Sequence, residues 1–102
     1  MIDVSEKHLQ IVVKILSGFV PDCEIRVFGS RYTGKTKPYS DLDLAIVGRQ
    51  QLPKGMVYNI IEAFQESDLP WRVDVLDWHS ISPEFRAVIE KSGYEVLTLI
   101  NK

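Results

Sequence analysis

Two aspartates stand one residue apart at the start of an apolar segment. Asp41 and Asp43 flank Leu42, and the run Leu42–Val47 is apolar except for Asp43. The run predicts a strand covered on both faces, and side chains two positions apart in a strand project from the same face. The two carboxylates would therefore lie close together and repel each other unless a cation lies between them. A hard divalent cation with oxygen ligands meets this need, and Mg²⁺ held together with a nucleotide is the usual case.

A third aspartate lies within a later strand candidate. Trp71–Leu76 alternates between apolar and polar residues, and Asp74 stands where an unpaired carboxylate would be costly. If the two strands are neighbours, Asp74 faces the same site as Asp43. Three carboxylates around one or two metal ions suit in-line phosphoryl or nucleotidyl transfer, in which Asp74 would orient or deprotonate the attacking hydroxyl. Taken alone, Asp74 could equally lie on the solvated face of an edge strand.

The segment between the first two strand candidates carries groups that suit an anionic substrate. Gly29 would let the backbone approach phosphates, and the hydroxyl of Ser30 would bind them together with the amides of a short helical turn. Arg31, Lys35 and Lys37 form a local positive patch that could meet a triphosphate. The alternative for these three cations is an ordinary solvated loop.

The same segment, from Gly29 to Thr36, also matches the Walker A pattern. In a P-loop a helix begins at the Lys-Thr pair, so that its first amides hold phosphate. Pro38 disfavours the helical conformation at Lys37, and the next strand begins too soon for the crossover that parallel strands require. We therefore reject a P-loop NTPase and expect a mostly irregular segment with one helical turn.

Hydrophobic periodicity predicts the elements that position these residues. Their order, one helix followed by two strands and then alternating helices and strands, is that of an α/β or α+β domain. The expected helices cover about 5–19, about 55–67, and from Ser82 or Pro83 to near Gly93; the expected strands are Glu24–Phe28, Leu42–Val47, Trp71–Leu76 and Tyr94–Ile100.

Length and composition restrict the class of protein. The chain has 102 residues, which we expect to form one domain over 1–102. The net charge of −2 argues against direct nucleic-acid binding, which usually shows a large basic excess. No apolar run approaches the roughly 18 residues that a membrane span needs. The single cysteine, Cys23, excludes an internal disulfide and fits a structural thiol in a reducing cytoplasm.

Taken as a set, the site residues resemble the signature of the polymerase-beta-type nucleotidyltransferase superfamily. The matching positions are a helix-opening Gly-Ser pair, an Asp-x-Asp segment preceded by serine, and a third aspartate on a later strand: Gly29, Ser30, Arg31, Ser40, Asp41, Asp43 and Asp74. The resemblance covers essentially the whole chain and is closest to the minimal nucleotidyltransferases. It implies a mixed β-sheet flanked by helices. It further implies a triphosphate site at the first four of these residues and a catalytic metal triad at the three aspartates.

The resemblance also implies a reaction and a partner. Mg²⁺ and a nucleoside triphosphate donor, with ATP the expected one, are typical of the family. Many minimal members pair with a helical HEPN-domain toxin, which they are thought to neutralise by transferring AMP to a tyrosine. A hetero-oligomer with such a partner is therefore expected. Tyr32 departs from the family pattern, in which a small residue is common at this position.

Two other functions are compatible with the same residues. The chain could be a non-catalytic module that binds a nucleotide or a partner by contact alone, since its small size leaves no room for an acceptor-binding domain. It could also transfer a nucleotide to a small molecule such as an aminoglycoside, although that would normally require more chain to form the acceptor pocket.

Overall fold

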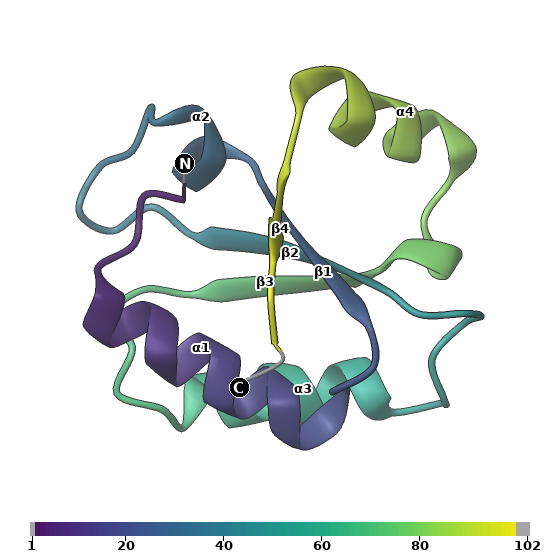
Figure 1. Cartoon of the computed structure of the whole chain (residues 1–102), viewed down its shortest axis with the longest axis horizontal. Coiled ribbons are helices and arrows are strands. Elements are labelled where there is room, and N and C mark those ends of the chain that lie inside the picture. Colours follow the sequence, from purple (N-terminus) through teal and green to yellow (C-terminus); the bar gives the residue numbers. More distant parts are fainter. Residues whose placement is uncertain (1, 100–102) are drawn as a thin grey trace.

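The computed structural model of the chain describes residues 2–99. Four α-helices, one 3-10 helix and four strands are present in this part, and Figure 1 shows their arrangement. In chain order they are α1 (Glu6–Phe19), β1 (Glu24–Phe28), α2 (Ser30–Thr33), β2 (Leu42–Val47), α3 (Met56–Gln65), β3 (Val73–Asp77), η1 (Trp78–Ser80), α4 (Pro83–Ser92) and β4 (Glu95–Leu97).

The strands form one mixed sheet in the order β3-β2-β1-β4. β1 pairs antiparallel with β2 on one side and with β4 on the other, whereas β2 and β3 are parallel. The parallel pair is connected through α3, as a crossover requires. The expected α/β class with a small mixed sheet flanked by helices is therefore confirmed.

One face of the sheet carries the main core. In Figure 1, α1 and α3 lie together along the lower side of the sheet. Their buried stripes meet alternate residues of the strands, which is why these strands alternate in burial. The fully buried members are Val12, Leu16, Ile25, Val27, Leu42, Leu44, Ile46 and Ile60.

A smaller cluster lies on the opposite face, where α4 and η1 cover part of the sheet. Ala45 of β2 packs there with Trp78 and Ile89. Ala45 and Asp43 are two positions apart in β2 and therefore share this face. The chain thus covers one end of the second face with apolar side chains and places its carboxylates toward the other end.

Local signals explain where the helices begin and end. The hydroxyl of Ser5 accepts a hydrogen bond from the amide of His8, and that of Ser82 accepts one from Phe85, so both serines cap helices. Pro83 occupies the first turn of α4, where its missing N–H costs nothing, and Gly93 ends that helix. These helices agree with the predicted ranges.

The third strand is one of two strands whose bounds differ from prediction. It begins at Val73 rather than Trp71 and ends at Asp77 rather than Leu76. Trp71 instead packs beneath Arg31, whose guanidinium carbon lies 4.5 Å from the ring centroid. The last strand is shorter than expected, covering Glu95–Leu97, and the predicted strand end at Ile100 lies outside the described residues.

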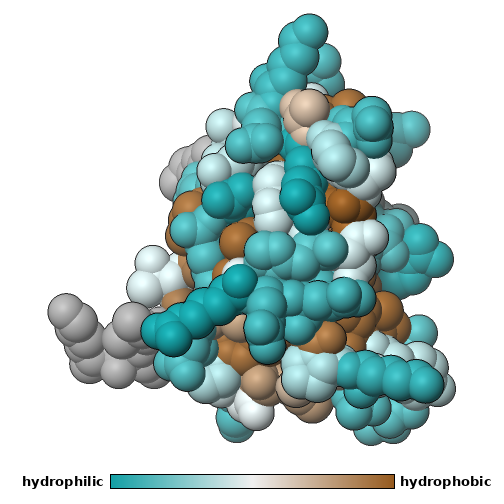
Figure 2. Space-filling view, turned by 90° about the vertical axis from the view of Figure 1, so that its right-hand side faces the viewer, coloured by the Kyte–Doolittle hydropathy of each residue, from teal (hydrophilic) through white to brown (hydrophobic). Residues whose placement is uncertain are grey.

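The surface on the side of α4 is largely hydrophilic. In Figure 2, apolar residues appear there as separate patches among hydrophilic ones. Of the helices in residues 2–99, none has the length and apolar composition needed to cross a membrane.

Candidate active site

The parallel pairing of β2 and β3 brings two of the three aspartates together. Asp43 and Asp74 are direct neighbours in the register of the two strands. Because paired residues of adjacent strands point to the same face, both carboxylates project from the face that α4 covers only in part. The expectation that Asp74 faces the site of Asp43 is confirmed. Asp41 stands immediately before β2, so it enters the site from the loop.

The surroundings of Asp43 perturb its titration. Burial raises its pKa, and the neighbouring carboxylates of Asp74 and Asp41 raise it further, to about 6. A hydrogen bond between Asp43 and Asp74 acts in the same direction, whereas the charge of Arg72 lowers the pKa. A carboxyl with a pKa of about 6 takes up a proton in mildly acidic solution, and a cation close to it would favour the ionised form.

Gly29 brings the turn after β1 directly against Asp43. Phe28 pairs with Asp43 across β1 and β2, and Gly29 follows with φ 77° and ψ −157°, a conformation that is essentially restricted to glycine. A Cβ at this position would collide with Oδ2 of Asp43 and would lie 3.1 Å from its Cγ. The absent side chain therefore lets the backbone of the Gly-Ser turn reach the carboxylate.

α2 is the short helical turn that the sequence predicts. It begins at Ser30 and ends at Thr33, and Gly34 follows in the left-handed conformation. Lys35 and Thr36 come after the helix has ended, in an irregular segment. β1 and β2 are antiparallel, which no Walker A crossover allows. The rejection of a P-loop is confirmed.

Arg31 holds this loop from inside. Its side chain is only 6% exposed and donates to three backbone carbonyls, of Ser40 at 3.0 Å, Asp3 at 2.9 Å and Pro38 at 3.4 Å. With these donors engaged, the guanidinium organises the loop that leads into Asp41. The expected contact of Arg31 with a triphosphate stays a prediction.

Ser40 also contributes to the loop. Its hydroxyl accepts a hydrogen bond of 2.8 Å from the amide of Lys37, and its carbonyl is one of the three acceptors of Arg31. Both contacts lie within the loop, so Ser40 helps to form the turn that leads into Asp41.

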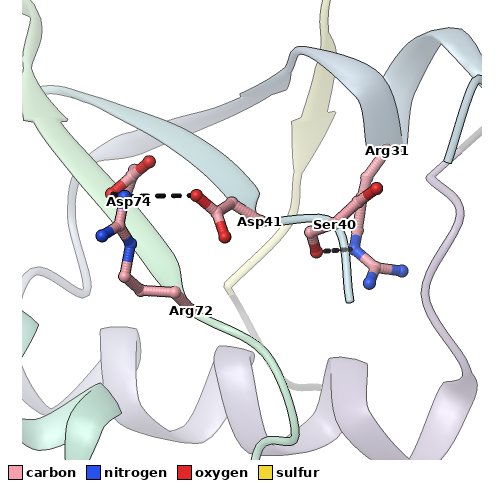
Figure 3. Close-up of polar contacts among 5 residues, drawn as sticks. All are labelled: Arg31, Ser40, Asp41, Arg72 and Asp74. Carbon is pink, nitrogen blue, oxygen red and sulfur yellow. Dashed lines mark hydrogen bonds and ion pairs between the residues drawn. The ribbon is translucent and has the colours of Figure 1, made fainter. Parts of the chain in front are cut away.

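Arg72 is a charged group of the site that the predicted set omits. Its Nη2 lies 3.2 Å from Oδ2 of Asp41 and 3.4 Å from Oδ1 of Asp74. Figure 3 shows the guanidinium reaching both carboxylates, while Arg31 and Ser40 form a separate contact. The sequence does contain a signal for Arg72. Arg72 and Asp74 are two residues apart, and residues two apart along a strand share a face, so Arg72 is expected beside the carboxylates.

The match to known families agrees with this geometry. Residues 6–96 match the family described as "Nucleotidyltransferase domain". The chain belongs to this nucleotidyltransferase family. It is an enzyme of the nucleotidyl-transfer class, and its family uses a nucleoside triphosphate donor with a divalent metal.

One protein sequence and two solved structures are reported as relatives of this nucleotidyltransferase. The chain is 50% identical over 90 residues to the "Probable protein adenylyltransferase MntA" of Haemophilus influenzae, covering 88% of this chain and 79% of the relative. Among solved structures, it resembles a chain of a toxin-antitoxin complex with AMP-PNP, with a TM-score of 0.70 and 22% identity over 92% of this chain and 73% of the other. A mutant MntA-HpeT toxin-antitoxin structure gives a TM-score of 0.68 at 19% identity, with the same coverage. At these identities the structural likeness establishes the fold.

The donor set of this nucleotidyltransferase fits a hard divalent cation. Carboxylate oxygens are the ligands that Mg²⁺ prefers, and the three aspartates approach from two strands and one loop. Within residues 2–99, the side chains of histidine, cysteine, aspartate and glutamate form no group of three or more that is already arranged to hold a metal ion. In this structure the guanidinium of Arg72 lies between Asp41 and Asp74.

Three further aromatic or histidine side chains near the strand ends make packing or backbone contacts. Trp78 is 8% exposed, and the guanidinium of Arg26 lies 4.6 Å from its ring centroid. His79 contacts the carbonyl of Gly48 at 2.7 Å. Tyr32, which departs from the family pattern, lies against Gly93, where a Cβ would be 2.8 Å from the tyrosine ring.

Proposed function

We propose that this protein is a Mg²⁺-dependent nucleotidyltransferase that transfers AMP from ATP to a hydroxyl, with a tyrosine of a HEPN-domain toxin as the acceptor. By this reaction it would act as the antitoxin of its partner. Residues 1–102 would work as one domain, in the cytoplasm, in a hetero-oligomer with the toxin.

The observation that carries the proposal is the convergence of Gly29, Asp43 and Asp74. The backbone of the Gly-Ser turn touches the first carboxylate, and the second faces it from the adjacent strand. A phosphate chain that lies along the turn would therefore place its reacting phosphorus beside the carboxylates. The backbone that would bind phosphate and the carboxylates that would act on a hydroxyl thus meet at one point.

In the proposed reaction, each residue has a distinct part. Gly29 and Ser30 bind the triphosphate, and Asp41 and Asp43 hold the metal, which offsets the negative charge of the phosphates. Asp74 is a further ligand or accepts the proton of the attacking hydroxyl. The hydroxyl oxygen forms a bond to the α-phosphorus of ATP, and the bond from that phosphorus to pyrophosphate breaks.

The acceptor is inferred from the relatives. The Haemophilus influenzae relative, which is 50% identical to this chain, is a probable protein adenylyltransferase. The similar solved structures are toxin-antitoxin complexes, one of them with AMP-PNP. These names favour ATP over other nucleotides and a protein over a small molecule as acceptor. The HEPN fold of the partner and the tyrosine follow from the family resemblance.

The test is direct labelling of the partner. The protein is incubated with Mg²⁺, ATP labelled in its α-phosphate, and the protein encoded by the adjacent gene. The partner should gain one AMP on a tyrosine, as located by mass spectrometry, and Asp43→Asn should abolish the labelling. Unlabelled partner, or equal labelling with Asp43→Asn, would refute the proposal.

One observation favours the alternative of a non-catalytic module. Because Arg72 already neutralises Asp41 and Asp74 in part, these acids are not left unpaired without a metal. A module of this kind would keep partner binding and toxin inhibition in Asp41→Asn and Asp43→Asn. Loss of inhibition in both variants, with partner binding retained, would exclude it.

A further inference from the structure

One nitrogen of Arg72 bridges two of the three carboxylates. The same atom, Nη2, contacts Oδ2 of Asp41 and Oδ1 of Asp74, at 3.2 and 3.4 Å. The two aspartates come from different segments, one from the loop before β2 and the other from β3. A single positive charge therefore holds together two negative groups that would otherwise repel each other (Figure 3).

The position of this nitrogen suits a cation in general. Asp41 and Asp74 each turn an oxygen toward it, and these oxygens are the donors that a divalent ion would use. A guanidinium and a metal ion cannot share these oxygens at short distance because both are positively charged. Binding of one therefore requires the other to leave.

The side chain of Arg72 is free to leave while its backbone stays. The backbone carbonyl of Arg72 accepts a hydrogen bond of 2.9 Å from the amide of Leu42, which fixes the main chain beside β2. The side chain is 67% exposed, so rotation into solvent disturbs no core packing. Exposed ion pairs of this kind are weak, so a divalent ion can displace them.

We propose that Arg72 is a built-in counter-cation that competes with the catalytic metal for Asp41 and Asp74. It positions the two carboxylates while the site holds no metal, and it weakens metal binding until the ion displaces it. The inference rests on the metal site of the proposed function. Arg72 is a positioning residue in this scheme, because it acts through the carboxylates.

The test measures metal binding without nucleotide or partner. Mn²⁺ is titrated into the metal-free protein, and free Mn²⁺ is followed by its electron paramagnetic resonance signal. We expect Arg72→Gln to bind Mn²⁺ about three- to tenfold more tightly than the wild type, as the loss of two exposed ion pairs predicts. Arg72→Lys, which keeps the charge, should remain near the wild type. Arg49→Gln is the matched control, because Arg49 is an exposed arginine just beyond the other end of β2.

Salt gives a second readout that a merely structural role would not produce. The difference between Arg72→Gln and the wild type should shrink at high ionic strength, since exposed charges are screened. Equal or weaker Mn²⁺ binding by Arg72→Gln, with wild-type binding intact, would overturn the role of Arg72 alone. Absence of Mn²⁺ binding in every variant would overturn both this inference and the proposed metal site.

Discussion

Replacing Asp43 by asparagine should stabilise the metal-free protein while abolishing transfer. Burial and the neighbouring carboxylates raise the pKa of Asp43 from 3.8 to about 6. The folded state therefore binds this proton more tightly than the unfolded state does. The contribution of Asp43 to the free energy of unfolding is therefore greatest below its pKa in the unfolded state. This contribution is lost as the pH rises through its pKa in the folded state. Above neutrality the folded protein carries the full cost of the ionised carboxylate, which asparagine removes.

The magnitude follows from the same shift. A pKa raised from 3.8 to about 6 corresponds to about 3 kcal/mol when the effect is complete. Because Asp43 is only partly buried, solvent screening reduces this to about 1–2 kcal/mol. For a domain of this size, that gain raises the melting temperature by about 5–10 °C. Asparagine also retains an N–H donor for the contact with Asp74.

The assay is thermal unfolding in the presence of a chelator, followed by circular dichroism. At about pH 8, Asp43→Asn should melt above the wild type, and at about pH 4.5 the gain should shrink to about a third because the wild-type carboxyl is then protonated. Asp22→Asn, which changes an exposed aspartate next to β1, should show no such dependence. Added Mg²⁺ should stabilise the wild type more than Asp43→Asn. A variant that melts below the wild type at about pH 8, or a gain that is independent of pH, would refute the reasoning.

Three further substitutions test the parts that support the site. Gly29→Ala should lower the free energy of unfolding in urea by about 1–3 kcal/mol and impair transfer, because the backbone there is restricted to glycine; Gly18→Ala, in open space, is the control and should be neutral or stabilising. Arg31→Ala should lower the free energy of unfolding by about 2–4 kcal/mol in the same assay, because it leaves loop carbonyls without their donor. A loss below about 1 kcal/mol, which is typical of surface substitutions, would contradict the role of Arg31 in the loop. Asp77→Ala should cost about 2–3 kcal/mol by thermal melting, because the buried carboxylate accepts from the amides of Leu52 and His79; an unchanged melting temperature would contradict this.

Much of the fold follows from local sequence signals. The ranges of β1 and β2 agree with prediction because alternating or continuous apolar runs are bounded by polar and breaker residues. Ser5 and Ser82 mark helix starts because their hydroxyls cap the first amides. The third strand was misplaced at its beginning because Trp71 fits the alternating pattern equally well. Its packing beneath Arg31 depends on a residue forty positions earlier, which no local pattern contains.

The sequence by itself determined that Asp41 and Asp43 form a close acidic pair, because strand periodicity places residues two apart on one face. It also determined that the Gly-Ser turn cannot be a P-loop, since Pro38 follows too soon. The tertiary structure alone decided three matters. The strand order placed Asp74 beside Asp43. The side chain of Arg31 became buried against three carbonyls of the loop, and the approach of β3 to that loop brought Arg72 between two carboxylates. Each depends on contacts between segments that are distant in the chain, and the period of a single element carries no information about which neighbour it will meet.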